Sequence, residues 1–202
     1  MPEQTERAIR QLWDARDFDR AATRAIESYG QEISRFLASR MVNAADAQDV
    51  FATFCEDLWS GLPGFAWRCS LRGWAYTLAR HAELRWRAAP AHRRHRLAEA
   101  TDPEMLARVR TTTAPYVRTD VKNRFRAIRS RLGEEDQTIL VLRVDRDLGW
   151  RDIAHVLAGP AAEPANDPQR EEARIRKRFQ IIKERLRRWA ADDGLLPARE
   201  SA

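Results

Sequence analysis

Apolar residues recur every three or four positions in two stretches near the start of the chain. The first stretch extends over residues 18–40 and the second over residues 46–59. This spacing gathers apolar side chains on one face of an amphipathic helix. The pattern therefore predicts two helices, the second of them capped by Asp46. The residues expected on the inner face of the second helix are Val50, Phe51, Phe54, Leu58 and Trp59.

A third helix is predicted after the turn residues Gly61, Pro63 and Gly64, with Ser70 as its cap. It extends to about residue 88. Its inward residues are expected to be Leu71, Trp74, Ala75, Leu78 and Ala82, and its outward residues Arg72, Arg80, Arg85 and Arg87. Within residues 1–17, the spacing of Ile9, Leu12 and Trp13 predicts a short helix that packs on this first body.

Residues 89–119 have a different character. Prolines stand at positions 90, 103 and 115, and no apolar period is sustained. This composition indicates a linker, with one short helix near residues 103–109.

A second body begins with a helix capped by Asp120, and another helix follows from about residue 132. The first of these has an apolar face of Val121, Phe125, Ile128 and Leu132. A short helix near residues 148–158 follows, closed by Gly159. Its inward residues are expected to be Ile153, Ala154 and Leu157.

The last helix is predicted to restart at Asp167 and Pro168, which suit the cap and the first helical position. Its apolar stripe is Ile175, Phe179, Ile182, Leu186 and Trp189. Its other faces are strongly basic, with Arg170, Arg174, Arg176, Lys177, Arg178, Lys183, Arg185, Arg187 and Arg188.

These patterns predict an all-α protein of two small helical domains. Residues 1–88 would form a bundle of three to four helices, and residues 120–202 would form the second domain, with residues 89–119 as a flexible linker. No strand-like alternation occurs along the sequence. The length of 202 residues suits two such domains.

The composition indicates a soluble, folded chain, with 44% hydrophobic and 33% charged residues. No apolar run approaches the roughly 18 residues that cross a bilayer, and the first residues are charged rather than signal-like. A cytoplasmic protein without membrane insertion is expected. Cys55 and Cys69 are expected to be buried or half-buried thiols. No ligand spacing typical of zinc occurs, so neither a metal nor another cofactor is expected.

Two features point to nucleic acid, alongside the net charge of +6. A short helix followed by a longer basic helix is the layout of a helix-turn-helix, although a basic surface helix of a bundle would look the same. Aromatic and basic residues also alternate around the third helix, as on surfaces that stack unpaired bases. They are Phe65, Trp67, Arg68, Trp74, Tyr76, Arg80, His81, Arg85 and Trp86. Trp74 is more simply a core residue, whereas Trp67 and Trp86 are better candidates for exposure.

Several segments resemble the extracytoplasmic-function sigma factors. DAQDVFATFCEDLW, LPGF and CSLRGWAYTLARHA resemble region two, in which one helix binds the polymerase clamp and the next reads the minus-ten element. RLGEEDQTILVLRVDRDLGWRDIAHVLAG and RIRKRFQIIKERLRR resemble region four, the helix-turn-helix that binds the minus-thirty-five element. The segments cover most of residues 18–88 and 120–190. The resemblance implies a factor that binds core RNA polymerase and directs promoter recognition and transcription initiation.

The resemblance also implies roles for individual residues. Polymerase contacts would be Asp49, Glu56 and Asp57. The loop Ala66, Trp67, Arg68, Cys69 and Ser70 would hold a base extruded from the non-template strand, and Arg72, Arg80 and His81 would follow that strand. On the last helix, Arg174, Arg176, Lys177, Arg178, Gln180 and Lys183 would meet the duplex. Members of the family are often held by an anti-sigma protein, so such a regulator is a candidate partner.

The sequence departs from the family pattern in two places. Ala52 and Thr53 stand where the family usually has a Gln-Glu pair, so an altered or weaker polymerase contact is expected. The segment from Gly159 to Asp167 is longer than the usual turn of a helix-turn-helix. This insertion over residues 160–167 is expected to be a bulge that points away from DNA. Alternatively, it repositions the last helix or binds a regulator.

An enzyme is not expected, because the sequence has no phosphate-binding glycine loop, nucleophile elbow or HExxH motif. Two alternatives to a sigma factor remain open. One is a sigma-like helix-turn-helix regulator that binds DNA without productive polymerase binding. The other is a helical adaptor whose basic helix meets an acidic protein.

Overall fold

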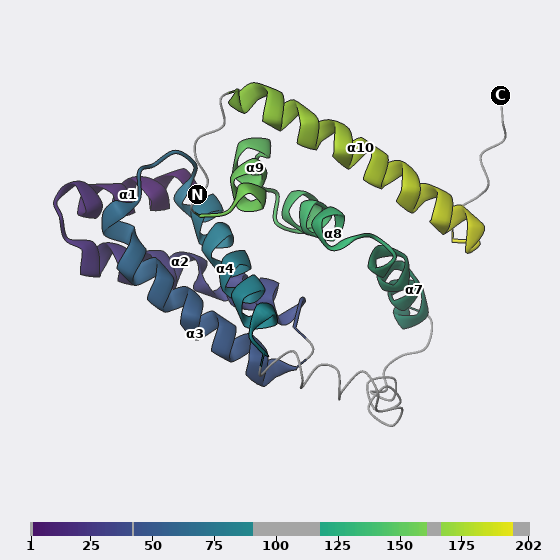
Figure 1. The fold of residues 1–202 in the computed structure, drawn as a ribbon, viewed down its shortest axis with the longest axis horizontal. Coiled ribbons are helices and arrows are strands. Elements are labelled where there is room, and N and C mark those ends of the chain that lie inside the picture. The colour runs from purple at the N-terminus through teal and green to yellow at the C-terminus, as the bar shows by residue number, and fades with distance from the viewer. Residues whose placement is uncertain (1, 42, 91–117, 161–166, 196–202) are drawn as a thin grey trace. The chain divides into compact units, whose positions relative to one another are not determined.

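The structure is a computed structural model that describes residues 2–41, 43–90, 118–160 and 167–195 (Figure 1). Helices make up nearly all of these ranges, and none of them contains a strand. The prediction of an all-α fold is confirmed. The expected short helix at residues 103–109 and most of the insertion at residues 160–167 lie outside the described residues.

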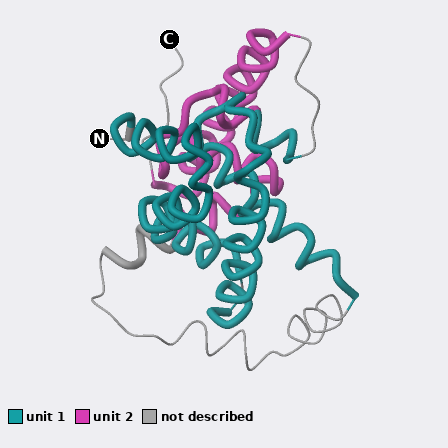
Figure 2. The backbone as a smooth tube through the Cα atoms, turned by 90° about the vertical axis from the view of Figure 1, so that its left-hand side faces the viewer, with its two compact units in different colours: residues 1–96, 155–163 teal, residues 97–154, 164–202 magenta. Residues whose placement is uncertain are grey.

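The chain divides into two compact units (Figure 2). Residues 1–96 with 155–163 form the first unit, and residues 97–154 with 164–202 form the second. Each unit is described here by itself.

The first unit is built from four helices, α1 (Pro2–Asp14), α2 (Phe18–Ala38), α3 (Ala44–Gly61) and α4 (Leu71–Ala88). Helix α2 packs against the other three. Its side chains Ile33 and Phe36 are fully buried, as are Phe54 and Leu58 of α3. The Phe36 ring meets the ring of Tyr76 edge-on, with 5.1 Å between centroids. The predicted N-terminal helix is confirmed as α1, which buries Ile9.

Helix α3 ends at Gly61 as predicted but differs from the prediction at its start and in its buried face. Its cap is Asn43 rather than Asp46, because the Asn43 side chain accepts a hydrogen bond of 2.8 Å from the Asp46 backbone N–H. The Asp46 carboxylate in turn accepts from the Asn43 amide at 2.8 Å, so the two side chains bind each other. The expected inward position of Trp59 is wrong, since 43% of its surface is exposed. The buried stripe of α3 is narrower than predicted and contains Val50, Phe54 and Leu58 with Ala47.

Helix α4 begins where the sequence predicts. Ser70 is its cap and accepts a hydrogen bond of 2.8 Å from the Gly73 backbone N–H. All five predicted inward residues are buried, Trp74 among them. Tyr76, Thr77, Ala79 and Glu83 are buried as well, so α4 is enclosed on more than one face. The expected outward position is wrong for Arg72, Arg80 and Arg87, because all three are half-buried. Arg72 and Arg87 lie in ion pairs.

The second unit contains α7 (Arg118–Ser130), α8 (Glu134–Leu140) and α10 (Pro168–Asp192), together with the first part of α9 (Trp150–Ala158). A π-helical turn, Val141–Asp145, follows α8 directly. Two predictions for α7 are wrong. The helix begins at Arg118, so Asp120 lies within it rather than at its cap, and Phe125 is 41% exposed.

Most of the predicted layout of α9 and α10 is confirmed. Gly159 follows α9 with φ +93°, a conformation that favours glycine. Asp167 caps α10 and accepts a hydrogen bond of 2.9 Å from the Arg170 backbone N–H, with Pro168 at the first helical position. The α10 stripe buries Ile175, Phe179 and Ile182 and leaves Leu186 and Trp189 half-buried. In α9, Ile153 and Val156 are buried, whereas Ala154 and Leu157 are only half-buried.

A buried ion triad joins α2 to α4 in the first unit. The Glu83 side chain is fully buried and lies 2.6 Å from Arg40 Nε and 2.6 Å from Arg87 Nη2. The Arg40 side chain is only 7% exposed. Removing one partner of a buried ion pair is costly, so the Glu83 carboxylate is an important counter-ion for the buried Arg40 guanidinium.

Replacing Glu83 with Gln should lower the free energy of unfolding by about 3–5 kcal/mol, because it leaves two arginines beside a neutral side chain. Urea unfolding of the full chain, followed by far-UV circular dichroism, measures the loss. The control is Glu27→Gln, which breaks an exposed pair with Arg24 at 3.4 Å and should cost under about 1 kcal/mol. Equal losses in the two variants would contradict the structural role of the triad.

Candidate nucleic-acid interface

The loop between α3 and α4 is packed rather than open. Phe65 stacks on Trp74, with 4.6 Å between ring centroids, and lies 4.9 Å from the ring of Trp67. Trp67 is half-buried and its indole nitrogen is shielded from solvent, so its expected exposure is not observed. Of the other loop residues implied to hold a base, Ala66 and Arg68 are exposed, Ser70 is half-buried and Cys69 is buried.

The basic side chains of α4 divide by their ion pairs. Arg72 donates two hydrogen bonds to Glu32, at 2.7 and 3.0 Å. Hydrogen bonding to this carboxylate raises the pKa of the Arg72 guanidinium. Arg85 is paired with Asp57. Arg80 and His81 are half-buried, and neither belongs to an ion pair among the described residues. One of the three residues implied to follow the strand, Arg72, is therefore held by an acid of its own unit, and so is Arg85.

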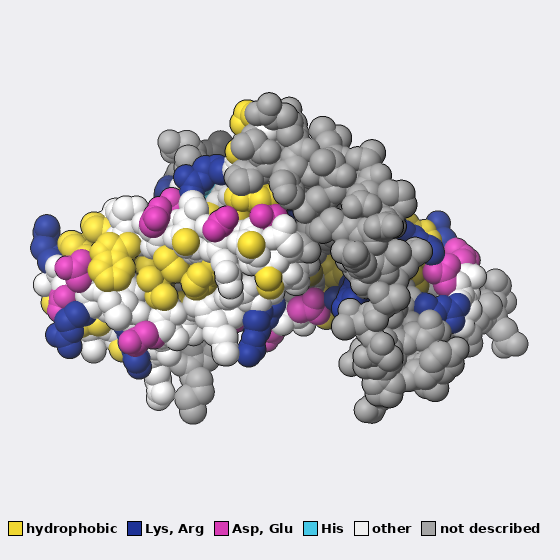
Figure 3. All heavy atoms as spheres, turned by 90° about the horizontal axis from the view of Figure 1, so that it is seen from below, with side chains coloured by type: hydrophobic (Ala, Val, Ile, Leu, Met, Phe, Trp, Pro, Cys, Tyr) yellow, Lys and Arg dark blue, Asp and Glu magenta, His cyan; other side chains and the backbone are white. Residues whose placement is uncertain are grey.

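Helix α3 presents acidic side chains and one large aromatic side chain to solvent. Asp49 and Glu56 are exposed, as predicted for a partner contact, whereas Asp57 is half-buried beside Arg85. Sequence reasoning missed the exposure of Trp59. On the face of the first unit drawn in Figure 3, hydrophobic side chains gather at the surface among charged ones.

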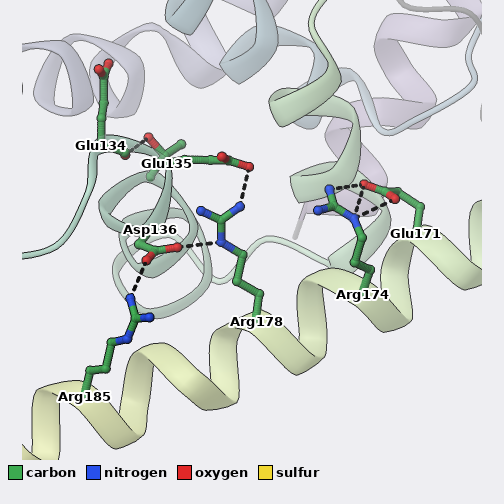
Figure 4. A network of polar contacts seen from close by, with 8 residues as sticks. Glu134, Glu135, Asp136, Glu171, Arg174, Arg178 and Arg185 are labelled. Atoms are coloured by element: carbon green, nitrogen blue, oxygen red, sulfur yellow. Dashed lines mark hydrogen bonds and ion pairs between the residues drawn. The ribbon is translucent and has the colours of Figure 1, made fainter.

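One side of α10 is neutralised by acids of its own unit (Figure 4). Arg178 lies 2.6 Å from Asp136 and 2.8 Å from Glu135, both in the first turn of α8. Arg185 reaches Asp136 at 3.6 Å. Arg174 pairs with Glu171 at 2.6 Å on α10 itself, and this hydrogen bond lowers the pKa of the Glu171 carboxyl.

Another set of polar side chains on α10 makes no ion pair within the part of the chain that the structure describes. It comprises the predicted residues Arg176, Lys177, Gln180 and Lys183, together with Arg170, Arg187 and Arg188. All of them are exposed except Lys183, which is half-buried. Most of this cationic face lies away from the buried stripe on the helical wheel. Lys183 borders the stripe, with its Nζ 5.2 Å from the centre of the Phe179 ring.

Trp150 is a contact residue that the sequence reasoning missed. Its ring lies 5.3 Å from the Phe179 ring, 4.8 Å from the Arg143 guanidinium carbon and 5.9 Å from that of Arg176. Such contacts between a cation and an aromatic face are attractive. The sequence offered one signal for this contact, since Trp150 stands at the start of α9, the first helix of the predicted helix-turn-helix.

No family model matches the chain. A search of curated proteins finds RNA polymerase sigma factor YlaC of Bacillus subtilis (strain 168), which is 30% identical over 133 residues. The alignment covers 64% of this chain and 75% of the relative. The chain belongs to the RNA polymerase sigma factors. The charged surfaces described above are therefore those of a sigma factor.

The described residues contain neither a candidate metal site nor a candidate membrane-spanning helix. In residues 2–41, 43–90, 118–160 and 167–195, no three His, Cys, Asp or Glu side chains are grouped so that they could hold a metal ion. Within the same ranges, no helix is long and apolar enough to cross a bilayer. Cys55 and Cys69 are free thiols, half-buried and buried respectively, as predicted.

The two classes of arginine on α10 should respond differently to mutation. Arg178→Ala should lower the free energy of unfolding by about 1–3 kcal/mol, because it removes charged hydrogen bonds to Asp136 and Glu135. Lys177→Ala, on the exposed face, should change it by less than about 0.5 kcal/mol. Urea unfolding of both variants makes the comparison. A larger loss for Lys177→Ala would contradict the assignment of Arg178 as a structural contact.

Proposed function

We propose that this sigma factor is of the extracytoplasmic-function type, that it binds core RNA polymerase and promoter DNA, and that it directs transcription initiation. Residues 1–88 would act as region two and residues 120–202 as region four, with residues 89–119 as the linker. The observation that carries the proposal is the cationic face of α10, whose side chains make no ion pair among the described residues, on a chain that belongs to the sigma factors. The name of the B. subtilis relative supports RNA polymerase as the partner.

The proposed role of α10 is to read the minus-thirty-five duplex with its cationic face. Arginine and lysine contact phosphates and guanine edges in the major groove, and glutamine contacts adenine. Arg176, Lys177, Gln180 and Lys183 are exposed or half-buried and have no acidic partner among the described residues. Arg174 is exposed and paired only with its neighbour Glu171, so DNA could replace that partner. Arg178 would serve mainly to orient the helix.

The first unit is proposed to bind the polymerase clamp through α3 and melted minus-ten DNA through the loop and α4. Asp49 and Glu56 are exposed and available for a polymerase contact, and exposed Trp59 lies on the same helix. Arg68, Arg80 and His81 are the proposed contacts to the single strand. Arg72 and Arg85 would reach DNA only by exchanging their acidic partners for phosphates.

Two weak contacts on one tether reinforce each other, because the first binding event raises the effective concentration of the second module. The free factor should therefore bind promoter DNA poorly, and its assembly with polymerase should make both contacts available.

In vitro transcription tests the proposal. The purified chain, mixed with core RNA polymerase and genomic fragments of its source, should start RNA at discrete sites that share upstream elements. Core polymerase alone is the control. Duplex binding without any polymerase-dependent transcript would favour the alternative, a sigma-like DNA-binding regulator. DNA affinity that barely changes between low and moderate salt would argue against phosphate contacts and for a protein-binding adaptor.

At a promoter found in this way, Arg176→Ala should weaken promoter recognition by about 1–3 kcal/mol if Arg176 reads a base edge. Selectivity at one position of the minus-thirty-five element should relax with it. Transcription from a set of single-base promoter variants measures both effects. Arg126→Ala is the matched control, since Arg126 is an exposed arginine on α7 of the same unit and lies outside the proposed contacts. An equal loss on every promoter variant would instead make Arg176 a phosphate contact.

A further inference from the structure

Three side chains on one face of α1 contact the segment that joins α3 to α4. Glu6, Arg10 and Trp13 follow the spacing of neighbours along a helix face. The Trp13 indole N–H donates to the Leu62 carbonyl at 2.8 Å, where the segment begins. The Glu6 carboxylate accepts from the Arg72 backbone N–H at 3.1 Å, where the segment ends.

The middle of the segment is held by the same helix. The Arg10 guanidinium carbon lies 4.8 Å from the centre of the Trp67 ring. The Trp13 ring meets Trp67 edge-on, with 6.0 Å between centroids. Helix α1 therefore touches the start, the middle and the end of the connection between α3 and α4.

The backbone of Trp67 requires such support. Its φ is +55°, in the left-handed region that non-glycine residues seldom adopt. This conformation costs free energy and persists only where the surroundings over-determine it. The contacts with Phe65, Trp13 and Arg10 supply that constraint, because the ring cannot turn without losing all three.

We infer that α1 is a positioning element that fixes the conformation of the loop 65–70 and, through it, the choice of unpaired base by the first unit. This inference rests on the proposed role of that loop in holding an extruded base. Base selectivity depends on side chains held in place before the ligand arrives. Arg10 and Trp13 would then affect selectivity through Trp67, as positioning residues rather than DNA contacts.

The experiment compares the double variant Arg10→Ala/Trp13→Phe with Arg7→Ala, which alters an exposed arginine of the same helix. Trp13→Phe keeps an aromatic ring but removes the N–H donor. Hydrogen exchange of the loop amides is measured in the free full-length protein. Exchange over residues 65–70 should accelerate about tenfold in the double variant and stay unchanged in Arg7→Ala.

The second measurement reads base selectivity, which a merely structural role would not alter. The full-length factor, assembled with core RNA polymerase, selects from randomised single-stranded DNA of about 12 nucleotides, and the bound pool is sequenced. The wild-type protein and Arg7→Ala should enrich the same bases. The double variant should lose most of that preference, while total bound DNA changes less than about twofold.

The outcomes separate the two proposals. An unchanged base preference in the double variant, or unchanged exchange of the loop, overturns the inference. A third outcome is that the wild-type protein enriches no base, while hydrogen exchange of the loop still accelerates in the double variant. This result would contradict the proposed DNA-binding role of the loop but support the conclusion that α1 fixes the loop conformation. If circular dichroism shows that the double variant is unfolded, Arg10→Ala alone carries both measurements, because it truncates an exposed side chain.

Discussion

The ion pairs of Arg178 with Glu135 and Asp136 fix the rotation of α10 about its own axis. The two acids lie in the first turn of α8, where the helix dipole also favours negative charge. They therefore stabilise the start of one helix and hold an arginine of another. With the apolar stripe at Ile175 and Phe179, they decide which side of α10 faces its own unit. Net charge alone could not have indicated this division, because both sides of the helix are rich in arginine.

In the first unit, aromatic rings rather than ion pairs hold the loop before α4 in place. Its loop before α4 carries no long ladder of backbone hydrogen bonds, and the packing of Phe65, Trp67 and Trp74 replaces one. Helix α1 supplies the remaining constraint through Trp13. The sequence predicted only that α1 packs on the first unit. In the structure, α1 also contacts the loop where nucleic acid is proposed to bind.

The sequence was most informative where the signal is local. Ser70 and the pair Asp167 and Pro168 begin helices as predicted, because a cap depends on residues within one turn. It was less informative where a neighbour distant in the chain decides the outcome. Arg72 and Glu32 lie 40 positions apart, and Arg178 and Asp136 lie 42 apart, so no periodicity links them. The consecutive acids Glu134, Glu135 and Asp136 were the one available signal for the second pairing.

The prediction errors at Trp59 and Phe125 have a related cause. Apolar character at the edge of a helical stripe does not say whether a neighbouring helix extends far enough to cover the residue. Asp46 was misjudged for another reason, because Asn43 is an equally good cap and captures the Asp46 N–H. The site residues implied by the resemblance remain predictions. The structure divides the basic residues among them into those paired with an acid and those without an acidic partner among the described residues.

The triad of Arg40, Glu83 and Arg87 has a wider consequence. Two guanidinium groups contact the same carboxylate, that of Glu83. Arg87 also donates to the Arg40 carbonyl at 2.9 Å, just beyond the end of α2, where the helix dipole is negative. The residue at which α2 ends therefore decides where a backbone acceptor meets the Arg87 guanidinium. A chain that extended or shortened this helix by one turn would move that carbonyl out of reach of Arg87 and leave the contact between α4 and the end of α2 to the Glu83 ion pairs.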